Sequence, residues 1–153
     1  MKIHCPAFNY GDRIPDRFTL DYENLSPPLK WDDVPEGTVE FALVCDDPDA
    51  PMGTWVHWVI YGIPGDLREL PEGLPKGPVV KNLGDAKQGR TGFGHMGYDG
   101  PRPPKGPDHR YFFRLYALSA EVDMGPGETA TFLREKIENS KLAEAQTMGT
   151  YSR

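Results

Sequence analysis

The chain has 153 residues, of which 38% are hydrophobic and 26% are charged, a size and composition typical of one globular domain spanning residues 1-153. Its formal net charge of −6 at pH 7 lacks the basic excess of a general nucleic-acid binder. No apolar run approaches the roughly 20 residues of a membrane-spanning helix, and the opening stretch MKIHCPAFNY lacks the apolar centre of a signal peptide. We therefore expect a cytoplasmic domain with no nucleic-acid partner and no integral membrane segment.

Three segments predict buried β-strands. They are VEFALVC (39–45), TWVHWVIYGI (54–63) and RYFFRLYAL (110–118), all rich in β-branched and aromatic residues. Each is almost continuously apolar, as expected for central strands that are covered on both faces. The 16 prolines and 17 glycines are scattered along the chain, which indicates many short elements joined by turns.

The C-terminal part predicts helices. In TATFLREKIEN, Leu133 and Ile137 are four positions apart, the spacing of one helix face. The next stretch, SKLAEAQTMG, begins with a capping candidate, Ser140, and ends at Gly149. We therefore predict a terminal helical segment with a break near residues 139–140, and a fold that is mostly β with C-terminal helices.

The segment CDDPDAP (45–51) ends the first strong strand with a group of carboxylates, those of Asp46, Asp47 and Asp49. These side chains either shape a turn through bonds to the backbone, pair with Arg110, or belong to a site. Two prolines so close together suit a tight turn, and we predict a cis peptide bond before Pro48 or Pro51. Cys5 and Cys45 are the only cysteines, and we expect free thiols, with Cys45 buried, and no disulfide framework.

Histidines occur in two of the predicted strands. Strict alternation in WVHW would place His57 on the same face as Trp55, Val59 and Tyr61. A lone histidine there is more often a satisfied core residue than a functional one. In DHRYFFRLYAL (108–118), His109 and Tyr111 are two positions apart, so their polar tips share a face and call for a common partner.

Two adjacent loops contain further patterns. GFGHMG (92–97) matches a dinucleotide-binding pattern, but the proline-rich GYDGPRPPKGPD that follows forbids the helix which that site requires. Its glycine N–H groups instead suggest an anion-binding nest. The proline-rich loop is either a preformed pocket wall or a rigid surface connector. No nucleophile motif, phosphate-binding loop or metal-ligand spacing is present.

Taken in order, several motifs resemble the phosphatidylethanolamine-binding protein family, also called the Raf kinase inhibitor protein family. They are SPPLKW (26–31), DPDAP (47–51), HW (57–58), GYDGPRPP (97–104) and HRYFFRLYAL (109–118). The resemblance is greatest to the bacterial and archaeal branch. It implies an antiparallel β-sandwich-like core, C-terminal helices and a small pocket that takes phosphate, phosphonate or a phosphatidylethanolamine headgroup.

The same resemblance implies which residues bind the ligand. Asp47, His57, His109 and Tyr111 match pocket residues, and Gly100 matches a position whose backbone faces the anion. The expected ligand-binding set is Asp47, Pro51, Trp55, His57, Gly100, His109 and Tyr111. No cofactor and no metal ion is expected.

We therefore expect a non-catalytic module that binds a small anionic or phosphorylated ligand and regulates a partner protein. Two alternatives stay open at this point. One is a protein inhibitor of a kinase or a serine protease, and the other is a hydrolase using His57, His109 and Asp47, against which the missing nucleophile and metal motifs count. Association of two copies into a homodimer also stays open.

Overall fold

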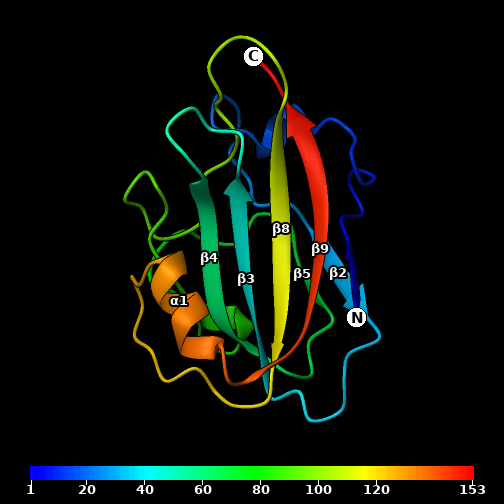
Figure 1. Ribbon diagram of the computed structural model, residues 1–153, viewed down its shortest axis with the longest axis vertical. Coiled ribbons are helices and arrows are strands. Elements are labelled where there is room, and N and C mark those ends of the chain that lie inside the picture. Colours follow the sequence, from blue (N-terminus) through cyan, green and yellow to red (C-terminus); the bar gives the residue numbers. More distant parts are fainter.

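The computed structural model describes residues 1–153 and contains two antiparallel β-sheets (Figure 1). The small sheet has the order β1-β2-β5, with β1 (Lys2–His4), β2 (Leu29–Asp32) and β5 (Glu69–Leu70). The large sheet has the order β6-β7-β4-β3-β8-β9 and contains β6 (Val79–Val80), β7 (Ala86–Gln88), β4 (Trp55–Pro64), β3 (Glu40–Asp47), β8 (His109–Leu118) and β9 (Lys141–Tyr151). The helices are α1 (Ala130–Ile137) and two short 3-10 turns, Asp16–Phe18 and Lys81–Leu83. The prediction of a mostly β, antiparallel, sandwich-like fold is confirmed.

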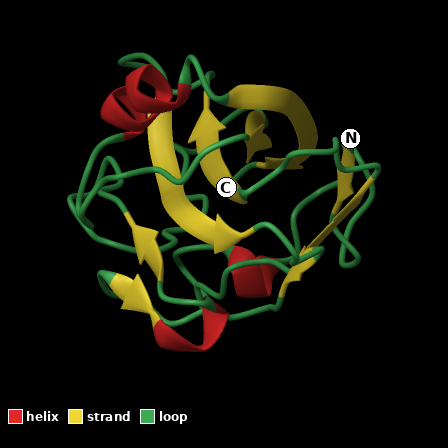
Figure 2. Cartoon of the chain, turned by 90° about the horizontal axis from the view of Figure 1, so that it is seen from below, coloured by secondary structure: helices red, strands yellow, loops and turns green.

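The main core fills the space between the two sheets. Trp31 of β2 packs edge-on against Phe41 of β3, with ring centroids 5.2 Å apart. A second apolar cluster lies on the other face of the large sheet, where Leu133 and Ile137 of α1 pack with Val44 of β3. Figure 2 shows α1 outside the large sheet, at the periphery of the molecule. Because β3 lies between these two clusters, all eight of its residues are buried, as the apolar run FALVC in its centre predicts for residues 41–45.

The predicted second helical stretch is wrong, because residues 141–151 form β9. This strand pairs with β8 over its whole length, from Lys141 opposite Leu118 to Tyr151 opposite His109. The N–H and hydroxyl of Ser140 both bond the carbonyl of Ile137, so Ser140 closes α1 instead of starting a helix. Pairing along an available sheet edge outweighs the helix propensity of SKLAEAQ, which is a weak local preference. The structure therefore has one C-terminal helix.

Strand β4 contains two register shifts against β3. Cys45 pairs with Trp58 and Asp46 with Val56, so His57 is an extra residue in β4. A β-bulge of this kind interrupts the alternation of side chains. His57 consequently faces the Tyr111 side of the sheet, whereas Val59 lies in the α1 cluster on the other side. The predicted grouping of His57 with Val59 and Tyr61 is therefore wrong.

The turn after β3 is made without a cis peptide bond. Every peptide bond in the chain is trans, so the predicted cis bond before Pro48 or Pro51 is wrong. The chain reverses instead because the N–H of Asp49 donates to Oδ1 of Asp47 at 2.8 Å, and the N–H of Gly53 donates to the carbonyl of Ala50. Such a side-chain turn bends the backbone with ordinary peptide geometry.

Two further predictions can be compared with the structure. Cys5 and Cys45 are both buried free thiols, as predicted, and burial raises the pKa of the Cys45 thiol well above its ordinary value. None of the helices combines the length and the apolar character needed to cross a bilayer.

Candidate functional site

A cavity of about 260 Å³ opens at one end of the large sheet. This end is where β3 finishes at Asp47 and where β4 and β8 begin at Trp55 and His109, near the top of Figure 1. Three neighbouring strands of one sheet therefore bring together residues that are distant in sequence. The lining residues are Asp47, Ala50, Pro51, Met52, Trp55, His57, Phe93, Arg102, Pro103, Pro104, His109 and Tyr111.

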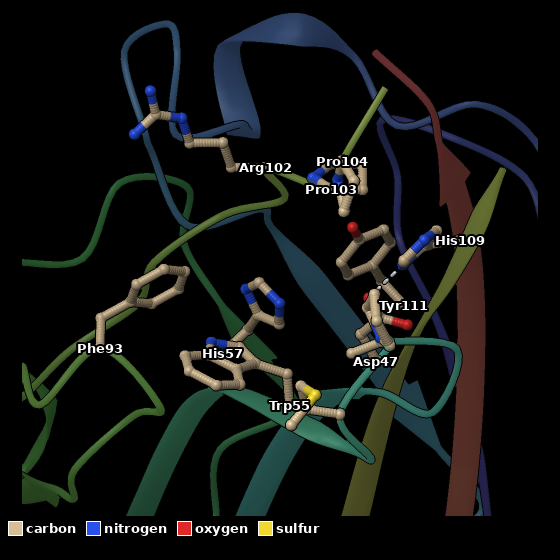
Figure 3. A pocket seen from close by; sticks show the side chains of 12 residues that line it. Asp47, Trp55, His57, Phe93, Arg102, Pro103, Pro104, His109 and Tyr111 are labelled. Atoms are coloured by element: carbon tan, nitrogen blue, oxygen red, sulfur yellow. Dashed lines mark hydrogen bonds and ion pairs between the residues drawn. The ribbon is translucent and has the colours of Figure 1, made fainter. Parts of the chain in front are cut away.

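Asp47 and His109 form a buried pair on one side of the cavity (Figure 3). Nδ1 of His109 lies 2.7 Å from Oδ2 of Asp47, and the two side chains are only 9% and 4% exposed. The other carboxylate oxygen of Asp47 accepts the N–H of Asp49. Because both oxygens have partners, the carboxylate is fixed in place, and it directs Nε2 of His109 away from itself.

The ring of His57 lies on the opposite side of the cavity. Its Nδ1 is 2.7 Å from the backbone carbonyl of Asp99, which can only accept a hydrogen bond. Burial lowers the pKa of His57 below its ordinary value, and the carbonyl of Asp99 only partly opposes this effect. The ring is therefore held as a neutral imidazole with its proton on Nδ1.

The hydroxyl of the buried Tyr111 lies beneath Pro103 and Pro104 in the view of Figure 3. Burial raises the pKa of Tyr111, and the nearby carboxylate of Asp47 raises it further. The phenol therefore keeps its proton and remains a hydrogen-bond donor at physiological pH. The ring of Tyr111 meets that of His57 edge-on, with centroids 5.2 Å apart.

Three polar atoms on the cavity wall have no partner in the protein: Nε2 of His57, Nε2 of His109 and the hydroxyl of Tyr111. No buried side-chain nitrogen or oxygen of the protein lacks a hydrogen bond, so these three atoms are in contact with the cavity instead of being sealed in the core. Polar groups in such a position are satisfied by solvent or by a ligand. This convergence distinguishes the cavity from an ordinary surface hollow.

The rim of the cavity is apolar. Trp55 and Phe93 meet edge-on with centroids 5.5 Å apart, and the side chain of Met52 is almost fully exposed. Gly92 lies against the Trp55 ring so closely that a Cβ there would be 2.4 Å from Cε2 of the indole. Arg102 also lines the cavity, but its guanidinium is turned away and pairs with Asp21 at 3.0 Å (Figure 3).

The carboxylates of the CDDPDAP segment have three separate environments. Asp46 faces away from the cavity and pairs with Arg114 and Arg134. Asp49 pairs with Arg110 through two side-chain bonds at 2.9 Å, and this arginine holds the pKa of Asp49 at about 2. Only Asp47 reaches the cavity. The predicted pairing with Arg110 is therefore made by Asp49, and the predicted site carboxylate is Asp47 of the same short turn.

Six of the seven predicted ligand-binding residues line the cavity: Asp47, Pro51, Trp55, His57, His109 and Tyr111. Gly100 does not line it. Its N–H donates to Oδ1 of Asn24 at 2.7 Å, and a Cβ at this position would lie 2.1 Å from the carbonyl oxygen of Phe18. A close approach of two backbone segments therefore explains why the position is glycine.

Other lining residues were not predicted individually: Ala50, Met52, Phe93, Arg102, Pro103 and Pro104. The two prolines confirm that the proline-rich loop is a pocket wall. The anion-binding nest predicted at 92–97 is not available at its first three residues, because the N–H groups of Gly92, Phe93 and Gly94 all bond within the protein. The signal for Phe93 was its place in a glycine-rich loop whose glycines allow close approach to Trp55.

Fold and cavity together define a two-sheet β protein with a small ligand pocket at the end of its central strands. The family model described as phosphatidylethanolamine-binding protein matches residues 4–152, and the chain belongs to this family. It is 46% identical over 153 residues to a UPF0098 protein of the archaeon Methanothermobacter thermautotrophicus, covering 100% of this chain and 99% of that protein. It is 45% identical to a UPF0098 protein of the bacterium Aquifex aeolicus, covering 100% and 89%.

A solved structure supports the same assignment. Escherichia coli YbcL, described as a new member of the mammalian phosphatidylethanolamine-binding protein family, superposes with a TM-score of 0.92 at 29% sequence identity. The match covers 99% of this chain and 98% of that chain. The family relationship therefore extends over the whole fold, including all the strands that surround the cavity.

Proposed function

We propose that the protein is a non-catalytic module that binds a small phosphorylated ligand in the cavity at the end of the large sheet. The observation that carries this proposal is the convergence of three polar atoms without protein partners, those of His57, His109 and Tyr111, on one cavity. A phosphoryl group presents several oxygens in different directions, so it can meet polar atoms from three sides at once.

The cavity size and the apolar rim support a small ligand with an organic part. A volume of about 260 Å³ is below the range of drug-sized pockets, and accommodates a phosphoryl group and a few additional atoms. Trp55, Phe93 and Met52 offer apolar surface at the mouth. The phosphoryl group would lie among the polar atoms inside, and its substituent would contact the rim.

Isothermal calorimetry with ethyl phosphate tests the proposal. We expect saturable binding to the unmodified protein and about tenfold or greater weakening in Tyr111→Phe, which removes a single donor and preserves the ring. Tyr22→Phe changes an exposed tyrosine outside the cavity and is the matched control. If ethyl phosphate does not bind, or if Tyr111→Phe and Tyr22→Phe bind it with equal affinity, the proposal that the ligand binds in this cavity is wrong.

The Asp47–His109 pair is also the arrangement of an oriented general base, so hydrolysis must be measured in the same experiment. No serine, cysteine, threonine or lysine lines the cavity, so hydrolysis would use an activated water or one of the lining histidine, tyrosine or aspartate side chains as the nucleophile. We expect no release of inorganic phosphate from ethyl phosphate. Turnover that disappears in His109→Ala would replace the binding module with a hydrolase.

A further inference from the structure

Arg102 is the only lysine or arginine that lines the cavity. We propose that its side chain forms a second anion subsite at the mouth of the cavity, so that the pocket favours phosphorylated ligands whose organic part carries a second anionic group, such as a carboxylate. In the structure the guanidinium pairs with Asp21, and such a ligand draws it away from this partner. The inference rests on the proposed function, since it concerns the ligand of the same cavity.

The other lining residues offer no fixed positive charge to a second anionic group. Asp47 contributes a carboxylate that is held by His109. Burial lowers the pKa of His57, which keeps its ring neutral near pH 7. An anionic group that leaves water needs an opposite charge or several donors as partners. Among the lining side chains, only that of Arg102 carries a positive charge at every physiological pH.

The present partner of Arg102 has a second arginine beside it. Nε of Arg102 lies 3.0 Å from Oδ1 of Asp21, and Nε of Arg153 lies 3.1 Å from Oδ2 of the same carboxylate. Asp21 therefore keeps a cationic partner when Arg102 leaves. The side chain of Arg102 is 53% exposed, and exposed ion pairs of this kind contribute little to stability. Release of Arg102 from Asp21 should consequently need little free energy.

The backbone at Arg102 is held in place, so only the side chain has to move. Prolines flank Arg102 on both sides and restrict the main chain. The carbonyl of Pro101 also accepts the N–H of Leu20, the residue before Asp21. Arg102 lines the cavity, whereas its guanidinium points away from it (Figure 3). Rotation about the side-chain bonds therefore suffices to exchange the carboxylate of Asp21 for an anionic group of the ligand.

The rest of the rim is suited to the carbon part of such a ligand. Trp55, Phe93 and Met52 present apolar surface that cannot pair with a charge. In the proposed function the phosphoryl group occupies the polar atoms inside the cavity, so a second anionic group on a short carbon chain lies at the mouth. A guanidinium binds a carboxylate or a phosphoryl group through two parallel N–H bonds, which suits Arg102 to this position.

Ethyl phosphate and phosphoglycolate provide a matched pair of probes, since a carboxylate in phosphoglycolate replaces the methyl group of ethyl phosphate. We expect calorimetry at about 0.15 M salt, where distant charges are screened, to give about tenfold tighter binding of phosphoglycolate. Arg102→Gln should remove most of this preference and change the affinity for ethyl phosphate much less. Lys105→Gln is the matched control, because it removes an exposed positive charge from the same loop outside the cavity and should keep the preference.

A variant of Asp21 tests the exchange of partners. Asp21→Asn removes the charge that competes with the ligand for Arg102, so phosphoglycolate should bind several-fold more tightly than to the unmodified protein. When Asp21→Asn is combined with Arg102→Gln, this gain should disappear, because no guanidinium is left to release. A gain of the same size with and without Arg102 would show that Asp21 acts through its charge alone, and would contradict the exchange.

The outcomes separate this inference from the proposed function. If neither compound binds, the proposed function itself is wrong. If Tyr111→Phe weakens both compounds but their affinities are equal, or if the preference for phosphoglycolate persists in Arg102→Gln, then the binding module stands and the second subsite at Arg102 is wrong.

Discussion

The imidazole of His109 and the carboxylate of Asp47 are 2.7 Å apart in the structure although 62 positions separate them in the sequence. The bond joins the last residue of β3 to the first residue of β8. It therefore fixes the end of a sheet and one wall of the cavity at the same time, so changes to the pair should affect both stability and binding.

Replacement of His109 by alanine should lower the free energy of unfolding by about 1 to 3 kcal/mol, because one oxygen of a buried carboxylate loses its partner. Urea denaturation at neutral pH measures this change. His4→Ala, on the exposed side of β1, is the control and should change stability by less than about 0.5 kcal/mol. If the two variants are equally stable, the buried pair makes no net contribution to folding.

The contribution of the Asp49–Arg110 pair to the free energy of unfolding should decrease in acid. The arginine lowers the pKa of Asp49 from 3.8 to about 2, so the pair stabilises the protein above the higher value and loses its effect as the pH falls toward the lower one. Asp49→Asn should therefore be less stable than the unmodified protein at pH 7, by at most about 1 kcal/mol because the pair is partly exposed. Only below about pH 2, where the Asp49 carboxyl is protonated in the folded and in the unfolded chain, should the two proteins have the same stability. A difference that persists unchanged down to this pH would contradict the assignment.

His57 should produce a pH dependence of the same sign at higher pH. Its pKa in the folded protein lies below 6.5, so on acidification the unfolded chain binds a proton that the native chain does not. Stability should consequently fall as the pH drops below about 6.5. Urea denaturation at several pH values should give a shallower fall for His57→Asn, in which this group is absent, and parallel curves would show that His57 is not buried as a neutral ring.

A methyl group at Gly92 should alter the rim. Its Cβ would lie 2.4 Å from the Trp55 indole, so the ring must move in Gly92→Ala. We expect a change in tryptophan fluorescence and weaker binding of ethyl phosphate, with a smaller effect on inorganic phosphate, which has no group to contact the rim. Gly125→Ala is the matched control, because a Cβ at Gly125 meets no atom within 4 Å.

The central strands could be predicted from sequence because β3, β4 and β8 are covered on both faces and contain long apolar runs. β9 could not be predicted in this way. Its first six residues are exposed or only partly buried, and its pairing depends on β8, which is more than twenty positions earlier in the chain. A local pattern does not contain that information.

The site could be predicted in part for a similar reason. His109 and Tyr111 share a face through simple alternation, and motif resemblance supplied Asp47 and His57. The bulge that turns His57 toward the cavity could not be predicted, because it depends on how β4 pairs with β3. The proton position on His57 also depends on a long-range contact, with a carbonyl 42 positions away.

The pairing of β3 with β8 also bears on how the cavity forms during folding. These strands pair residues as far apart as Glu40 and Leu118. The entropy cost of closing so long a loop arises before the contacts between the strands can stabilise the chain. A ligand that needs Asp47 and His109 together finds no binding site before that closure. Ligand binding should therefore slow unfolding of the protein and leave its folding rate unchanged.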